Sequence, residues 1–202
     1  ERGKGKRILT DNELILFLKW LPTAAFSENV RDSLFLALYT GCRSGEIVQA
    51  SWKDIDLDQG TYHLTDTKTG VDRTVQLSSQ AIQLLSTRKD NGSDFVFPSN
   101  RGNKPIQQKA IVIALCHKRN GVLPKDTLKI DNWSAHDLRR TTRSGLSRLR
   151  CPSNIAEAIL GHSKKGVEGT YDLHQYEDEA KEWLQTWCDH ISLLASKERV
   201  NE

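Results

Sequence analysis

The sequence contains no methionine, only four cysteines and no long apolar run. Cys42, Cys116, Cys151 and Cys188 lie far apart and form no Cys-x-x-Cys pair. Disulfide frameworks and zinc sites need clustered cysteines, so neither is signalled, and a reducing cytoplasm is the expected location. No stretch approaches the roughly 18 apolar residues that cross a membrane, and no signal peptide is visible. We therefore expect a soluble protein with no membrane partner.

The chain begins with Glu and contains no Met, so we expect it to be a fragment of a longer protein. Its 202 residues, of which 37% are hydrophobic, are enough for one large domain or two small ones with a buried core. No repeat or low-complexity tract divides the chain further.

The net charge of +3 is unevenly distributed along the chain. Residues 171–202 hold three basic and eight acidic side chains, which leaves a charge of +8 on the first 170 residues. Residues 129–150 alone hold six basic and two acidic side chains. Such a patch can neutralise backbone phosphates of a nucleic acid, although a solvated helix face has the same composition.

Apolar spacing predicts a mainly α-helical fold with a small antiparallel sheet of three strands. Thr10 and Glu13 form a capping-box pattern before the first helix, Gly41 stops the second, and Ser134 caps a later one. The predicted helices cover 14–21, 27–40, a short segment from Arg43, 79–88, 105–118, 134–149, 153–160 and 177–194. The predicted strands lie at 55–57, 61–64 and 73–77.

Three motifs carry side chains suited to a phosphodiester. Residues 40–47 read TGCRSGEI, residues 135–141 read AHDLRRT, and Leu160-Gly161-His162 is followed nine residues later by Tyr171. In this order the motifs resemble the tyrosine recombinases, or phage integrases, from about Leu9 to His174. The first two stretches look most like the integrases of P4-type prophages and genomic islands.

The resemblance implies the tyrosine recombinase catalytic-domain fold and a division of the chain into three parts. Residues 1–8 are a basic linker, residues 9–175 form the catalytic domain, and residues 176–202 form a C-terminal helix and tail. The apolar face of that last helix either covers its own core or docks on a neighbouring protomer, and the sequence leaves both open.

The resemblance assigns the phosphate-binding groups to the three motifs. Arg43 and Arg139 are the two clamps, because each guanidinium is permanently charged and its fork matches two phosphate oxygens. His136, three residues before Arg139 and so on the same helix face, is implied as a hydrogen-bonding acid/base group. His162 is implied to donate a hydrogen bond to the phosphate. Glu46, one turn after Arg43, is positioned to hold that guanidinium in one rotamer.

The resemblance also supplies a general acid and a nucleophile. Lys68, in a predicted hairpin turn, would protonate the 5′ oxygen as it leaves, and Tyr171 would form a 3′-phosphotyrosyl link that stores the free energy for religation. Tyr176 is the rival nucleophile. The alternatives to Lys68 are Lys53, Lys104 and Lys109.

No cofactor or metal is expected, because the cationic side chains would supply the charge that a metal ion otherwise provides. The implied partner is a double-stranded DNA attachment site, bound by a homo-tetramer, with DNA-bending proteins as candidate accessories and a nucleoid-associated location when bound. The candidates for contact with the DNA backbone are Arg140, Arg143, Lys164 and Lys165.

Two other phosphodiester-cleaving signatures are incomplete in this sequence. An HD-type metal phosphohydrolase needs a second set of histidine and carboxylate ligands, which does not stand at fitting positions. The stretch from His162 to Lys164 begins like a phospholipase D signature, but Gly169 stands where that signature has Asp. A DNA-binding module with little catalysis and a type IB topoisomerase remain open alternatives.

Overall fold

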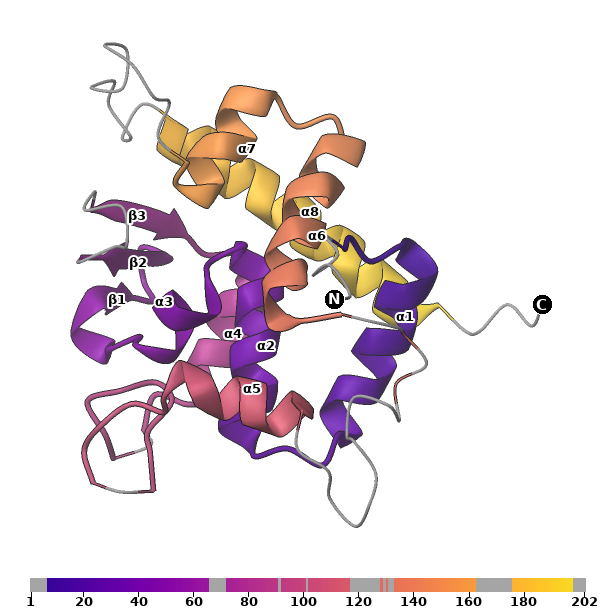
Figure 1. The fold of residues 1–202 in the computed structure, drawn as a ribbon. Coiled ribbons are helices and arrows are strands. Elements are labelled where there is room, and N and C mark those ends of the chain that lie inside the picture. The colour runs from indigo at the N-terminus through magenta and orange to yellow at the C-terminus, as the bar shows by residue number, and fades with distance from the viewer. Residues whose placement is uncertain are drawn as a thin grey trace.

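The computed structural model describes residues 7–65, 72–90, 92–100, 102–116, 128, 130, 133–162 and 176–197. Its α-helices are α1 (Asp11–Trp20), α2 (Glu28–Thr40), α3 (Ser44–Val48), α4 (Ser79–Ser86), α5 (Gln108–Cys116), α6 (Ala135–Arg148), α7 (Ser153–Leu160) and α8 (Glu177–Ser196). The strands are β1 (Ile55–Asp56), β2 (Thr61–Leu64) and β3 (Arg73–Gln76), and two short 3-10 helices are η1 (Leu21–Thr23) and η2 (Trp52–Asp54). Figure 1 shows their arrangement. The predicted fold class, mainly α with one three-stranded antiparallel sheet, is confirmed.

Local capping explains where several helices begin and end. The main-chain N–H of Thr10 donates to Glu13 at 2.9 Å, and the helix starts directly after Thr10, three residues earlier than its apolar pattern suggested. The main-chain N–H of Ser134 donates to Asp137 in the same way at 2.9 Å. Gly41 ends α2 in the left-handed region at φ 66°, a conformation that costs glycine little.

The start of α5 differs from the prediction. The helix begins at Gln108 rather than at residue 105, because Pro105 takes part in an isolated bridge with Pro98. The main-chain N–H of Ile106 then donates to Phe97 O at 2.8 Å, so this stretch pairs with an extended segment before the helix begins.

The sheet is an antiparallel meander in the order β1-β2-β3. In its register Tyr62 lies opposite Val75, and Leu64 lies opposite Arg73. Tyr62, Leu64 and Val75 are buried, whereas His63 between them is exposed, which is the alternation expected of a sheet covered on one face.

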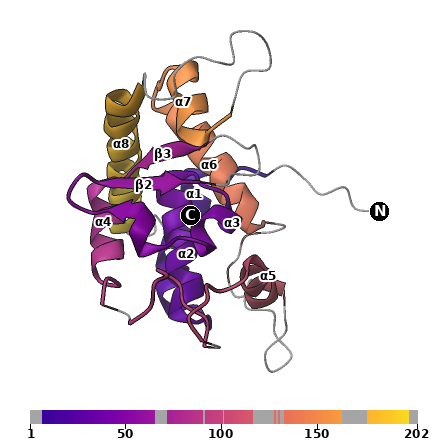
Figure 2. The same cartoon turned by 90° about the vertical axis from the view of Figure 1, so that its left-hand side faces the viewer.

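Two apolar clusters make up the core, and α2 contributes to both. Leu34 and Leu38 belong to a helical cluster with α1, α6, α7 and α8, whereas Leu36 and Ala37 belong to a second cluster under the sheet and α4. Figures 1 and 2 show the sheet and α3 beside the helices, with α2 running through the middle. The C-terminal end of α2 therefore lies where the two clusters meet.

The last helix, α8, packs into the core of its own chain. The Trp187 indole N–H donates to Leu38 O at 2.9 Å, and a Cβ on Gly145 would lie 2.1 Å from the Trp187 ring. The absence of a side chain at Gly145 thus allows α6 and α8 to approach closely. Docking of this region on a neighbouring protomer remains a prediction.

The structure also describes the cysteine thiols and the length and apolar character of the helices. The four thiols are free. Among the helices of the described ranges, none combines the length and the apolar character needed to cross a membrane.

Candidate active site

Arg43 occupies the N-terminal cap of α3, two residues after the left-handed Gly41. A Cβ on Gly41 would lie 2.8 Å from the side chain of Leu160, so glycine is needed both for the backbone angle and for the approach of α7. Glu46 holds Arg43 twice, accepting from its main-chain N–H at 2.8 Å and from Nη1 at 2.7 Å. The Arg43 side chain stays 25% exposed, so its guanidinium is fixed in direction but open to a ligand.

The Arg139 side chain projects from α6 toward Gly41, two residues before Arg43, and Arg139 is only 4% exposed. Its guanidinium donates to Gly41 O and to Leu160 O, each at 2.6 Å. Burial lowers the pKa of Arg139 to about 10, and the nearby Arg43 guanidinium adds to this effect. The protein therefore holds a cation in a position that an anion would stabilise.

His162 follows Gly161, which ends α7 in the left-handed region. Its Nε2 lies 2.9 Å from Arg139 Nη2, and its Nδ1 lies 2.5 Å from Glu157 Oε2. Because a guanidinium only donates, Nε2 must accept here and the ring proton must sit on Nδ1. Donation from Nε2 to a phosphate, which the resemblance implies, therefore requires a second proton on the ring or the other tautomer.

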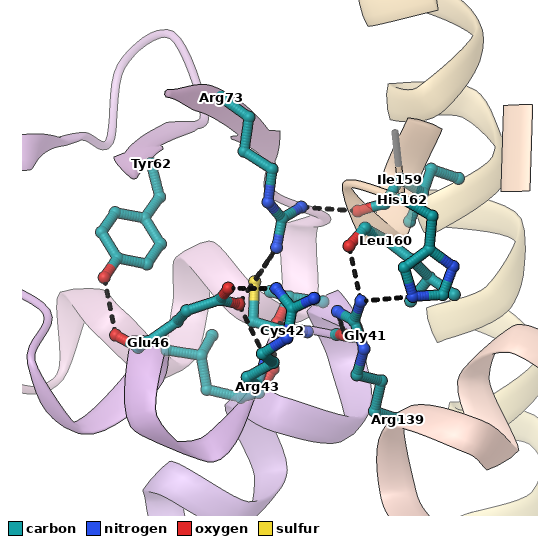
Figure 3. A network of polar contacts seen from close by, with 12 residues as sticks. Gly41, Cys42, Arg43, Glu46, Tyr62, Arg73, Arg139, Ile159, Leu160 and His162 are labelled. Carbon is teal, nitrogen blue, oxygen red and sulfur yellow. Dashed lines mark hydrogen bonds and ion pairs between the residues drawn. The ribbon is translucent and has the colours of Figure 1, made fainter. Parts of the chain in front are cut away.

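Arg73 also belongs to this network, although the sequence motifs gave no role to it. From the first position of β3, Nη1 donates to Ile159 O at 2.7 Å, and Nη2 lies 3.1 Å from Glu46 Oε2 and 3.6 Å from Cys42 Sγ. Figure 3 shows the guanidinium groups of Arg43, Arg73 and Arg139 gathered from three different elements.

His136 lies on α6 at the edge of this network and is exposed. It lines a pocket of about 520 Å³ together with Arg43, Glu46 and Tyr62. Partial burial lowers the pKa of His136, and the charges of the neighbouring Arg140 and then Arg139 lower it further. A neutral imidazole is therefore favoured beside the arginines.

The structure thus brings together four of the residues proposed for the site, Arg43, Glu46, Arg139 and His162, and places His136 beside them. The other predicted catalytic residues, Lys68 and Tyr171, lie outside the described residues, as do Lys164 and Lys165.

The two arginines proposed to contact DNA have partners within the chain. Arg140 pairs with Asp137, and Arg143 Nε lies 2.7 Å from Glu157 Oε1. Arg143 and His162 therefore share the Glu157 carboxylate, which places Arg143 next to the site. Contact of either arginine with DNA remains a prediction.

The alternative lysines and tyrosines are described by the structure. Lys53, Lys104 and Lys109 are all exposed. Tyr176 is partly buried against the helical cluster at the start of α8. Tyr62 is buried and donates to Glu46 O at 2.8 Å; burial raises its pKa. Within the described ranges, no group of three or more His, Cys, Asp or Glu side chains is placed to hold a metal ion.

Known proteins with similar sequences or structures include integrases and tyrosine recombinases. Prophage integrase IntA of Escherichia coli is 28% identical over 194 residues, which are 92% of this chain and 44% of IntA. The integrase from mycobacterium phage Brujita has a TM-score of 0.67 at 14% identity and covers 97% of this chain and 61% of its own. A lambda integrase tetramer bound to a Holliday junction has a TM-score of 0.60 at 18% identity over 82% of this chain and 48% of its own. The chain spans about half the length of the curated relatives it matches.

A family model described as the phage integrase family matches residues 7–188. That range contains all three sequence motifs and every residue that Figure 3 labels. The solved structures show the same fold at low sequence identity. The chain therefore belongs to the phage integrase family, as its motifs predicted, and has the fold of a tyrosine recombinase catalytic domain.

Proposed function

We propose that this chain is the catalytic part of a site-specific DNA recombinase that cuts and reseals DNA through a tyrosine. The observation that carries this proposal is the cluster of Arg43, Arg73 and Arg139, in which Glu46 is the one carboxylate in contact among the described residues. Three guanidinium groups around one carboxylate leave an excess of positive charge in a partly buried place. A phosphodiester, with its single negative charge and two free oxygens, suits such a place.

In the proposed reaction the oxygen of Tyr171 attacks the phosphorus and the bond to the 5′ oxygen breaks. Arg43 and Arg139 bind the two free phosphate oxygens and stabilise the charge that grows on them. Lys68 gives a proton to the leaving 5′ oxygen. In religation a 5′ hydroxyl attacks the phosphotyrosyl link and Tyr171 leaves, so the number of phosphodiester bonds is conserved and no nucleotide is hydrolysed.

His162 and His136 complete the proposed site in different ways. A phosphate that draws Arg139 away from His162 would free Nε2, and protonation there would make it a donor while Nδ1 stays on Glu157. His136, which lines the pocket beside Arg43, would take the phenol proton of Tyr171 during cleavage and return it to Tyr171 during religation.

The proposed partner is a double-stranded attachment site, and the proposed working assembly is a tetramer on DNA inside the cytoplasm. Support comes from the lambda integrase relative, whose solved structure is a tetramer bound to a Holliday junction. The prophage relative IntA supports a mobile element of the prophage or genomic-island kind as the source. Arg140, Arg143, Lys164 and Lys165 are the side chains that we propose for the DNA backbone, and DNA-bending proteins remain candidate accessories.

A covalent capture assay tests the nucleophile. The protein is incubated with a nicked suicide duplex built from the parent element's junction, and the protein–DNA band is read on a denaturing gel. We expect wild type and Tyr176→Phe to give the band and Tyr171→Phe to give none, with DNA affinity nearly unchanged in all three. Equal loss of the band and of binding in Tyr171→Phe would contradict the assignment. Nicking and closing without exchange between partner sites would indicate a topoisomerase instead.

A sulfur-substituted duplex tests the general acid. Sulfur in place of the bridging 5′ oxygen gives a leaving group that needs no proton. We expect Lys68→Ala to cleave normal DNA poorly and to regain cleavage on the sulfur duplex, whereas Lys53→Ala behaves as wild type on both. Absence of rescue in Lys68→Ala would assign the acid to another residue.

A further inference from the structure

We propose that Arg73 is a positioning residue of this active site, which fixes the direction of Arg43 through Glu46 and fixes the turn before His162 through the Ile159 carbonyl. The inference rests on the proposed function, because it assigns Arg73 to the same phosphate-binding cluster. The Arg73 side chain is only 5% exposed and its Nη2 is already paired with the Glu46 carboxylate, so it acts through its neighbours rather than by touching the phosphate.

The first link runs from Arg73 to Glu46. Oε1 of Glu46 accepts from Arg43 Nη1, whereas Oε2 accepts from the Arg43 main chain and from Arg73 Nη2 at 3.1 Å. Burial alone would raise the pKa of Glu46, but the guanidinium groups of Arg73 and Arg43 hold it below its usual value. Both oxygens are therefore fixed, and the plane of this carboxylate sets the direction in which Arg43 points.

The second link runs from Arg73 to the end of α7. The last carbonyls of a helix have no partner within the helix, and here Ile159 O accepts from Arg73 while Leu160 O accepts from Arg139. A Cβ on Gly161 would lie 2.5 Å from Arg73 Cδ, so the backbone of the turn rests directly on this side chain. Two arginines thus hold consecutive carbonyls just before His162.

The third link is the position of Arg73 in the sheet. Arg73 pairs with Leu64 at the end of the β2–β3 ladder, and these two residues flank the segment that contains Lys68. The first residue of β3 therefore joins this strand, through one side chain, to α3 and to α7. Arg73 joins the part of the chain that carries the proposed acid to the parts that carry Arg43 and His162.

A buried ion pair could also stabilise the fold without any effect on the site, so the test needs a matched control. Arg88 provides it, because its side chain is 7% exposed and it likewise combines a carboxylate, Asp32 at 2.6 Å, with a main-chain carbonyl, Val96 O at 3.1 Å. Lysine at either position keeps the charge but loses the planar fork that reaches two partners at once. Arg73→Lys and Arg88→Lys therefore remove the same kind of contact from the site and from elsewhere.

Two measurements on these variants decide the proposal. The first is the ¹⁵N NMR signal of the Arg43 Nε–H group, assigned by its loss in Arg43→Lys, which reports whether that guanidinium is held. The second is the single-turnover rate of covalent complex formation on the suicide duplex, compared with DNA affinity and thermal unfolding. In Arg73→Lys we expect the Arg43 signal to shift and broaden and the rate to fall on the order of 100-fold, with affinity nearly unchanged. Arg88→Lys should lower the unfolding temperature but leave the signal and the rate as in wild type.

A second background tests the route through Glu46. In Glu46→Gln the carboxylate that transmits the effect is gone, so adding Arg73→Lys should lower the rate far less than it does in wild type. An unchanged Arg43 signal in Arg73→Lys, or a rate loss shared equally by Arg88→Lys, would overturn the proposal. If wild type itself forms no covalent complex, the proposed function fails, and the Arg43 signal still decides whether Arg73 positions Arg43.

Discussion

Among the described residues, arginine side chains are buried in two regions, around Arg88 and around Arg139, and the two regions differ in what balances the charge. Arg88 contacts the Asp32 carboxylate at 2.6 Å, and its guanidinium lies 5.1 Å from the centre of the Phe97 ring. Arg139 contacts two main-chain carbonyls and His162, and among the described residues no carboxylate. The first cation is paired within the fold, whereas the second is left for a partner from outside.

This difference separates a structural from a functional buried charge. Burying an unpaired charge costs free energy, so a fold selected for stability alone would pair Arg139 as it pairs Arg88. The cost is visible in Arg139, whose pKa burial lowers to about 10. A bound phosphate would remove that cost, which is how a site prepared in advance stabilises a charged ligand and its transition state.

The largest effects should come from replacing Arg139 or Arg88, each by itself, with alanine. Arg139→Ala should lower the rate of covalent complex formation on the order of 1,000-fold, because the proposed phosphate clamp is lost. Arg88→Ala should instead lower the free energy of unfolding by about 3 kcal/mol, because Asp32 is left partly buried without its ion pair. Urea unfolding and single-turnover cleavage, measured well below the unfolding temperature, check the two effects separately. A rate loss of the same size in Arg88→Ala would remove the distinction between the regions.

A smaller effect should follow from adding one methyl group at Gly161. Gly161 and Gly92 both have positive φ, 65° and 71°, so alanine brings a similar backbone strain of about 1 kcal/mol at each. The Cβ at 161 would lie 2.5 Å from Arg73 Cδ, whereas at Gly92 nothing lies within 4 Å. We expect Gly161→Ala to displace Arg73 and slow cleavage about 10-fold, a fraction of the cost of a misplaced catalytic group.

Gly92→Ala is the control, since it should reduce stability without slowing cleavage. Circular dichroism melting curves and the suicide-duplex assay give both quantities for each variant. Equal cleavage by the two alanine variants would show that the contact between Gly161 and Arg73 does not matter to the site.

The sequence predicted most elements of the fold, because their signals are local. Apolar spacing, the capping pairs and Gly41 lie within a few residues of the helix ends that they specify. Arg43 and Glu46 are also close in the sequence, so their contact could be expected from the spacing of one helical turn.

Arg73 shows why part of the site could not be predicted. Its partners Glu46 and Ile159 are 27 and 86 residues away in the chain, so no local pattern identifies the groups that Arg73 contacts. Gly145 is similar, because its close contact with Trp187 exists only after α8 has packed on α6. The one available signal for Arg73 was its place at the start of the predicted strand 73–77, on the same face as the apolar residues Val75 and Leu77.

The smallest predicted effect concerns the pKa of His136, which is lowered in part by the charges of neighbouring arginines. Burial lowers this pKa first, and the charges of Arg140 and Arg139 lower it further. Arg140→Gln removes one of these charges and also releases the Asp137 carboxylate from its ion pair with Arg140, so both changes favour the imidazolium and the pKa of His136 should rise. Arg88→Gln, in the balanced region, should leave it unchanged. An NMR titration of the His136 ring protons measures the pKa in each variant.

The sign of the linked stability change follows from the same shift. The pKa of His136 is lower in the folded than in the unfolded chain, so the unfolded chain binds more protons at a pH between the two values. The free energy of unfolding therefore decreases as the pH falls through that interval. Arg140→Gln should bring the folded and unfolded pKa values of His136 closer together, so the free energy of unfolding should decrease less as the pH falls. A titration in which Arg140→Gln leaves the His136 pKa where it is in wild type would mean that the Arg140 charge does not contribute to it. The difference between the two regions would then be supported only by Arg139, which contacts no carboxylate among the described residues, and by Arg88, which is paired with Asp32.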